Sequence, residues 1–284
     1  MLLGVHVSIA GHVYEAVTRA EKLGCNVMQI FSRDPRQWRK TKIQAADIEE
    51  FRKRRKAAGI RAVFVHVPYL VNLASPEGKL FYGSIRAVIE DIKEAEALGV
   101  EYMVLHSGSH KKKGENFGFQ RVSKALNRIL EKTRDCKVKL LLENTAGSGS
   151  WLGYKFMHHR KIIARVEQKE RVGVCLDTCH AYAAGYDLAT REGFDRLAGQ
   201  IEEQVGFERL GLVHLNDCAS GLGSHYDIHT HIGKGNIGLN GFRLLLKDPR
   251  FSGKPFILET PKEPATADKK NLKTVRGIVE EKTG

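Results

Sequence analysis

The chain has 284 residues, of which 42% are hydrophobic and 28% charged, with a formal net charge of +13 and a pI near 9.5. This composition excludes a small fold held together by disulfides and predicts a globular protein that buries its own core, in one large domain or two smaller ones. The basic balance favours a polyanionic partner such as nucleic acid, although many basic proteins bind none.

Cysteine usage and the lack of targeting segments indicate where the protein works. Five cysteines, an odd number without a C-x-x-C pair, are typical of reduced thiols in the cytosol. The amino terminus lacks a charged stretch followed by a long apolar core, so we expect no signal peptide. No apolar run approaches the roughly 18 residues that span a bilayer. We therefore expect a soluble, cytoplasmic protein.

Eight short apolar runs recur along the chain and predict β-strands. Because the runs are almost continuously apolar, they are typical of a parallel sheet covered on both faces. They occupy residues 2–8, 26–31, 62–66, 102–106, 139–143, 172–177, 210–214 and 255–259.

Segments with helical periodicity separate these runs, and Gly24, Gly59 and Gly99 are placed as C-terminal stops. Eight alternating units predict a closed (β/α)₈ TIM barrel formed as a single domain by residues 1–284. A doubly wound open sheet is the alternative architecture. The predicted helices cover residues 12–23, 46–58, 83–98, 119–132, 159–167, 191–205, 239–246 and 271–280.

Six consecutive predicted strands end in a histidine or a carboxylate. These residues are His66, His106, Glu143, Asp177, His214 and Glu259, and three more candidates, His180, Asp227 and His229, lie just beyond strands six and seven. One such histidine would ordinarily be a hydrogen-bonded core residue, and Asp177 alone could simply cap a helix. In a barrel, however, all strand ends meet at one rim. Burying four carboxylates and five imidazoles there without cations would be prohibitive, so the pattern predicts a polynuclear metal site.

Charge arithmetic favours a site open to an anion. The four carboxylates Glu143, Asp177, Asp227 and Glu259 offset two divalent ions, and a third ion leaves roughly two positive charges. A metal-bound hydroxide would remove one of them. Such a site suits a phosphodiester.

Several segments together resemble the signature motifs of the endonuclease IV family, the metal-dependent apurinic/apyrimidinic endonucleases of base excision repair. The resemblance extends from GVHVS at residues 4–8 to LETP at 258–261, nearly the whole chain. Between them lie HVPYL at 66–70, LENTAG at 142–147, CLDTCHAYAAG at 175–185, HLND at 214–217 and HIGKGNIG at 231–238.

The resemblance implies a hydrolase of the deoxyribonuclease IV type with three zinc ions, manganese being an alternative at one or more positions. It implies cleavage of the phosphodiester 5′ to an abasic site in duplex DNA by a metal-bound hydroxide, leaving a 3′-hydroxyl and a 5′-deoxyribose phosphate. His66, His106 and Glu143 would hold one ion, and Glu143 would bridge to a second. Asp177, His214 and Glu259 would complete that second site, and His180, Asp227 and His229 would hold the third ion.

The resemblance also implies DNA contacts by Arg36, which would enter the base stack, and by Tyr69 and Leu70, which would wedge the duplex open. We expect a monomer without an obligate protein partner. Four residues depart from the family pattern: His12, Ser148, Ile228 and Lys234. Ile228 stands where family members often carry Arg, so one phosphate contact is expected to be missing.

Two other hypotheses stay open from the sequence. A metal-dependent sugar isomerase or epimerase of the xylose isomerase-like barrels would need neither the third ligand group nor the charge of +13. A nucleic-acid-binding protein with purely structural metals is disfavoured because closed structural zinc sites are rich in cysteine.

Overall fold

The computed structural model describes residues 1–34, 37–38 and 43–281. Within these residues, eight parallel strands form one sheet in the order β1-β10-β7-β6-β5-β4-β3-β2. They are β1 (Leu2–Val5), β2 (Val27–Phe31), β3 (Ala62–His66), β4 (Tyr102–His106), β5 (Lys139–Glu143), β6 (Val172–Asp177), β7 (Leu210–His214) and β10 (Pro255–Leu258).

The sheet nearly closes on itself between β1 and β2. His6 forms a parallel bridge with Gln29, and the Val7 N–H donates to the Gln29 carbonyl over 2.8 Å. At the opposite end of these two strands, the Asn26 N–H donates to the Leu3 carbonyl over 3.2 Å. This seam confirms the predicted TIM barrel and excludes the doubly wound open sheet.

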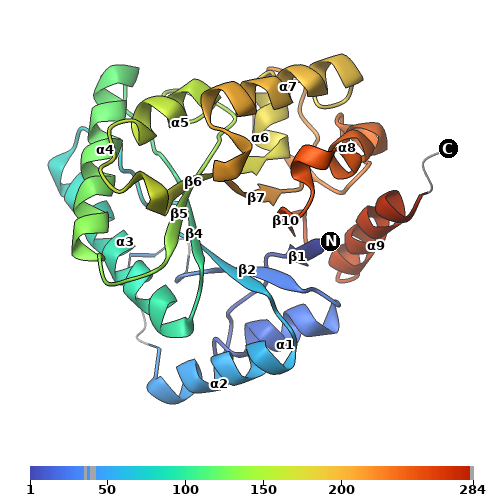
Figure 1. Cartoon of the computed structure of the whole chain (residues 1–284), viewed down its shortest axis with the longest axis horizontal. Helices are drawn as coiled ribbons and strands as arrows, with labels where there is room; N and C mark the ends of the chain where they lie inside the picture. Colours follow the sequence, from blue (N-terminus) through green and yellow to red (C-terminus); the bar gives the residue numbers. More distant parts are fainter. Residues whose placement is uncertain (35–36, 39–42, 282–284) are drawn as a thin grey trace.

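In the described part of the chain, eight helices alternate with the strands and surround the barrel (Figure 1). The three predicted glycine stops are confirmed, because Gly24, Gly59 and Gly99 adopt left-handed φ angles of 68°, 64° and 74°. The helices are α1 (Glu15–Lys22), α2 (Ala45–Ala57), α3 (Gly78–Leu98), α4 (Glu115–Lys132), α5 (Phe156–Ile163), α7 (Arg191–Gln204), α8 (Gly238–Lys247) and α9 (Ala267–Glu280). None of the described helices is long and apolar enough to cross a membrane.

Seven strands each contribute one buried side chain to a small core separate from the main one. These residues are Val27, Phe64, Val104, Leu141, Cys175, Leu212 and Ile257, and Leu2 of β1 packs against them. One residue per strand in a separate cluster is the arrangement of a barrel interior filled by a layer of side chains. The main core lies between the strands and the surrounding helices.

Several element bounds differ from the sequence predictions. Helices α3 and α4 begin at Gly78 and Glu115 rather than at residues 83 and 119, and β1 ends at Val5 rather than at residue 8. Short elements were missed because they carry too few residues for a periodic signal. They are α6 (Thr178–Ala183), the antiparallel pair β8 (Asp217–Cys218) and β9 (His229–Thr230), and three 3₁₀ turns at Lys169–Arg171, Phe207–Arg209 and Pro249–Phe251.

Candidate metal centre

The barrel register brings the strand-end ligands together. On β3, Phe64 belongs to the interior layer, and His66 lies two residues further along the strand. Since side chains two apart on a strand share a face, His66 also points into the barrel, one layer closer to the C-terminal rim. The same step of two leads from Val104 to His106 and from Leu141 to Glu143. It also leads from Cys175 to Asp177, from Leu212 to His214 and from Ile257 to Glu259.

All nine sequence-predicted ligands fall into three groups whose ligand atoms lie within 4.8 Å of one another. The first group is His66, His106 and Glu143; the second is Glu143, Asp177, His214 and Glu259; the third is His180, Asp227 and His229. The first two groups are buried or half-buried, whereas Asp227 in the third is exposed. The centre is therefore closed at its base and open at one side.

Glu143 belongs to both of the first two groups and is fully buried. Its Oε2 lies 3.0 Å from His66 Nε2 and 3.6 Å from His106 Nε2. Its Oε1 lies 3.0 Å from His214 Nδ1. The two oxygens of one carboxylate thus face two different sets of imidazoles, which is the arrangement of a bridging ligand.

The third group closes around Asp227. Asp227 Oδ2 lies 3.0 Å from His180 Nε2, and its Oδ1 lies 3.1 Å from His229 Nε2. His180 is positioned by α6, whose first turn is capped by Asp177: the His180 N–H donates to Asp177 Oδ1 over 2.7 Å. Asp177 therefore acts as a helix cap through one oxygen, while its Oδ2 lies 3.5 Å from His229 Nε2.

Hydrogen bonds behind the imidazoles fix how the rings are turned. The second ring nitrogens of His66, His180 and His229 lie against backbone carbonyls, those of Val67 at 2.7 Å, Asn144 at 2.9 Å and Glu259 at 3.2 Å. A carbonyl can only accept, so in each ring Nδ1 carries the hydrogen and Nε2 presents a lone pair to the centre when the ring is neutral. This is the support that metal-binding histidines normally have.

The pKa shifts of these side chains show that the cluster attracts positive charge. Burial alone would raise the pKa of Glu143, but His106 and His214 outweigh it and hold that pKa well below the usual range. Burial likewise opposes protonation of His229, yet Asp177 and Asp227 raise its pKa to about 9. Protons here compensate the buried carboxylates as cations would, so the donor set fits divalent ions.

Two polar residues missed by the sequence analysis support the centre. Gln29 is fully buried on β2 and donates from Nε2 to Glu259 Oε1 over 2.5 Å. His6 Nδ1 lies 3.3 Å from the same oxygen. A signal for both existed, because Gln29 follows the interior residue Val27 by two positions and His6 follows Gly4 by two. Gly4 is needed there, since a Cβ would lie 1.8 Å from the Val27 carbonyl oxygen.

The structure describes two of the three predicted DNA-contact residues, Tyr69 and Leu70. Tyr69 is 60% exposed at the rim, with its ring centroid 5.9 Å from that of His66 and 5.6 Å from that of Phe31. Leu70 beside it is half-buried. Arg36 lies outside the described residues.

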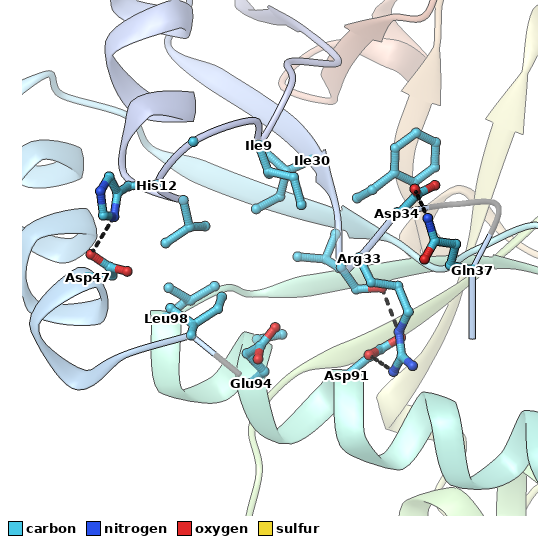
Figure 2. Close-up of a pocket in the computed structure, with 17 residues that line it drawn as sticks. Ile9, His12, Ile30, Arg33, Asp34, Gln37, Asp47, Asp91, Glu94 and Leu98 are labelled. Atoms are coloured by element: carbon cyan, nitrogen blue, oxygen red, sulfur yellow. Dashed lines mark hydrogen bonds and ion pairs between the residues drawn. The ribbon is translucent and has the colours of Figure 1, made fainter. Parts of the chain in front are cut away.

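A cavity of about 540 Å³ lies apart from these ligands and contains none of them in its lining (Figure 2). Its wall includes Arg33, which is buried, forms an ion pair with Asp91 of α3 and donates to the Trp38 carbonyl over 2.8 Å. Gln37 donates to Asp34 over 2.8 Å in the same wall. The ion pair with Asp91 ties Arg33 to α3.

Comparisons with known proteins agree with the fold. The family described as "Xylose isomerase-like TIM barrel" matches residues 17–278. "Probable endonuclease 4" of Methanoculleus marisnigri is 44% identical over 278 residues, which cover 98% of this chain and 99% of that protein. The crystal structure of endonuclease IV from Thermus thermophilus matches with a TM-score of 0.88 and 40% identity, covering 99% of this chain and 100% of that one.

A more distant structural match bears on the sugar-epimerase hypothesis. D-psicose 3-epimerase from Clostridium cellulolyticum has a TM-score of 0.71 but only 15% identity, covering 99% of this chain and 100% of the epimerase. That level of identity shows a shared fold alone. The similarity at 40% identity or above covers almost the full length and includes the segments that supply the three ligand groups. The chain therefore belongs to the endonuclease IV family, within the xylose isomerase-like TIM barrels.

Proposed function

We propose that the protein hydrolyses the phosphodiester 5′ to an abasic site in duplex DNA, leaving a 3′-hydroxyl and a 5′-deoxyribose phosphate. Its relatives named endonuclease 4 match over nearly the whole chain. The observation that carries the proposal is the third ligand group, because His180, Asp227 and His229 lie close enough together to hold a third cation beside the two candidate positions at the base of the barrel.

We assign the nine ligands to three zinc ions, with manganese as an alternative at one or more positions. When bound, such ions polarise a phosphodiester, stabilise its transition state and lower the pKa of bound water. Glu143 would bridge the first two positions, because its two oxygens face different imidazoles. Each of these three groups combines histidine nitrogens with carboxylate oxygens, and a fourth group consists of Cys179 with two of the same ligands, Asp177 and His229. Ligation mainly by histidine and carboxylate suits an open catalytic site better than a closed structural one.

Tyr69, Leu70 and Arg36 are proposed to contact the DNA around the lesion. Tyr69 is suited to this role because most of its side chain is exposed next to His66. An apolar side chain inserted at an abasic site replaces stacking that the missing base has already lost, so the cost of opening the duplex is low there. We further propose that residues 1–284 act as one barrel domain and as a monomer.

The decisive experiment uses an end-labelled duplex with one tetrahydrofuran abasic analogue, and an intact duplex of the same sequence as the control. The analogue cannot undergo β-elimination, so cleavage must be hydrolytic. We expect incision only at the lesion, with a 3′-hydroxyl that a DNA polymerase extends. Prolonged chelation should abolish incision, and added zinc should restore it.

Two other outcomes of this experiment would contradict the proposed function. Equal cleavage of the intact duplex would mean a nuclease without lesion specificity. No cleavage by protein with close to three bound metal ions would contradict the proposal and favour a sugar isomerase or epimerase, to be tested against small carbohydrates.

A further inference from the structure

An unusual set of exposed apolar side chains lies on the hairpin that connects β8 to β9. Leu222, Tyr226 and Ile228 are 49%, 69% and 52% exposed, and all three fall within seven residues. Single exposed apolar residues are ordinary on protein surfaces, but such a concentration commonly marks a binding surface. We call these three residues the apolar hairpin surface.

The surface lies directly beside the candidate metal centre. Tyr226 and Ile228 flank Asp227 in the chain, and the carboxylate of Asp227 reaches His180 and His229 within 3.1 Å. The Ala219 N–H donates to the Ile228 carbonyl over 2.9 Å and so continues the β8–β9 ladder by one residue. Because neighbours in an extended strand point to opposite faces, Asp227 points to the centre while Tyr226 and Ile228 point to solvent.

Hydrogen bonds hold the hairpin in this conformation. Asn236 donates from Nδ2 to the carbonyls of Cys218, Ala219 and Ser220 over 3.3, 3.1 and 3.0 Å. The Ser220 hydroxyl donates to the Tyr226 carbonyl over 2.5 Å. The exposure of Tyr226 is therefore built into the backbone of the hairpin.

A second anchor sits at the turn before Tyr226. The His225 N–H donates to the Ala183 carbonyl over 2.9 Å, and its Nδ1 lies 2.7 Å from the Ala146 carbonyl oxygen. His225 is held at a φ of 61°, an uncommon conformation for a residue with a side chain. Such conformations persist where surrounding contacts enforce them, and they occur often at functional sites.

We propose that the apolar hairpin surface packs against a nucleobase next to the phosphodiester that the centre hydrolyses. This inference rests on the proposed function. A nucleobase has an apolar face that any sequence offers, and aromatic and aliphatic side chains can cover it without reading its identity. Tyr226 and Ile228 are the chain neighbours of Asp227, so any molecule that packs against them also lies beside the candidate metal centre. It must therefore fit next to the substrate. A protein partner seated there would block the duplex.

The test measures DNA binding and base environment together. A cleavage-deficient form of each protein, carrying Glu143→Gln, is titrated into an abasic duplex with 2-aminopurine at successive positions beside the lesion. Tyr226→Ser combined with Ile228→Ser should raise the dissociation constant about 5- to 100-fold, the range for losing one stacked base. It should also remove the fluorescence change at the position that the wild-type protein contacts.

Three further variants sharpen the interpretation. Tyr226→Phe keeps the ring and should bind like the wild type. Leu239→Ser on α8 removes another exposed apolar side chain, 44% exposed, and should have no effect. Leu222 is five positions from Asp227 in the chain. Leu222→Ser therefore tests the surface even if the substitutions beside Asp227 reduce metal binding. Elemental analysis of the zinc-loaded variants measures any such reduction.

Unchanged affinity and unchanged fluorescence in both the double variant and Leu222→Ser would overturn the inference while leaving the proposed function intact. Analytical ultracentrifugation compares the oligomeric state of the double variant with that of the wild type. If the substitutions change only the sedimentation coefficient, the surface binds a second copy of the chain, and the inference is also overturned. If the wild-type zinc protein neither binds nor cleaves abasic DNA, the proposed function and this inference fail together.

Discussion

Gln29 and His214 are joined across the barrel by a hydrogen bond of 2.8 Å between Oε1 of the amide and Nε2 of the imidazole. Both side chains are fully buried. The amide oxygen can only accept, so Nε2 of His214 carries the hydrogen and Nδ1 faces Glu143 and Glu259, at 3.0 and 3.3 Å. A residue from β2 that touches no ion position thus determines which nitrogen of His214 is offered to the centre.

Replacing Gln29 with Leu keeps the volume but removes this acceptor. The Nε2–H of His214 is then buried without a partner, and the ring loses its fixed orientation. We expect metal affinity to fall about 10- to 100-fold, the usual effect of losing such a supporting contact. Competition against a chromophoric chelator measures it. Gln200→Leu on the exposed face of α7 is the matched control, and equal affinities for the two variants would contradict the role of Gln29.

Glu143→Gln should remove most of the cleavage activity. The amide has nearly the same shape but no charge, and only one of its two terminal atoms can accept a cation, so it cannot bridge two ions. We expect cleavage of the abasic duplex to fall by about 10²- to 10³-fold or more while DNA binding is retained. Gel-based cleavage rates and fluorescence anisotropy separate the two effects. Exposed Glu280→Gln serves as the control, and wild-type turnover by Glu143→Gln would rule out the bridging role.

Much of the fold could be predicted because each strand is short, apolar and followed by a helix. Five strands have the predicted bounds: Ala62–His66, Tyr102–His106, Lys139–Glu143, Val172–Asp177 and Leu210–His214. The six-residue helix α6 and the two-residue strands β8 and β9 escaped prediction, because less than two helical turns or two strand residues are too few for a periodic signal. They are fixed by local contacts instead, among them the cap that Asp177 provides for α6.

The proposed ligands could be named from sequence because the strand ends converge in a barrel. Gln29 and His6 follow Val27 and Gly4 by the same two-residue step, but this signal can be recognised only when the interior register is known, and without it both look like polar interruptions in apolar strands. The pairing of Glu143 Oε1 with His214, 71 residues away in the chain, is likewise a product of the closed sheet. The sequence therefore predicts which residues are candidate ligands, whereas their hydrogen-bond and ion-pair partners follow only from the register of the barrel strands.

His180→Ala tests whether the third group is an independent ion position. Its imidazole contacts Asp227 at 3.0 Å, and Asp227 belongs to neither of the other groups. We expect the bound zinc to fall from about three to about two ions per chain, since two ligands hold an ion far more weakly than three. Mass spectrometry of exhaustively dialysed protein gives the count. Exposed His12→Ala should keep the full complement, and an unchanged count in His180→Ala would contradict the assignment.

His159 should make the free energy of unfolding depend on pH. It lies on α5, is fully buried and belongs to none of the three ligand groups. Burial, reinforced by neighbouring His158, lowers its pKa from 6.5 to about 4. The folded protein therefore keeps His159 neutral at pH values where the unfolded chain protonates it.

The direction of the effect follows from proton binding. Between about pH 6.5 and pH 4 the unfolded state holds a proton that the folded state lacks, so stability is complete above pH 6.5 and falls as the pH is lowered. At 1.36 kcal/mol per pKa unit, the loss from this residue is at most ~3 kcal/mol by pH 4. His159→Leu should lose this contribution, so its urea unfolding curves from pH 7 to pH 4 should shift less than those of the wild type. The ligand histidines are the same in both proteins, so their titration cancels in the comparison. Parallel curves for His159→Leu and the wild type would mean that His159 accepts a proton without unfolding.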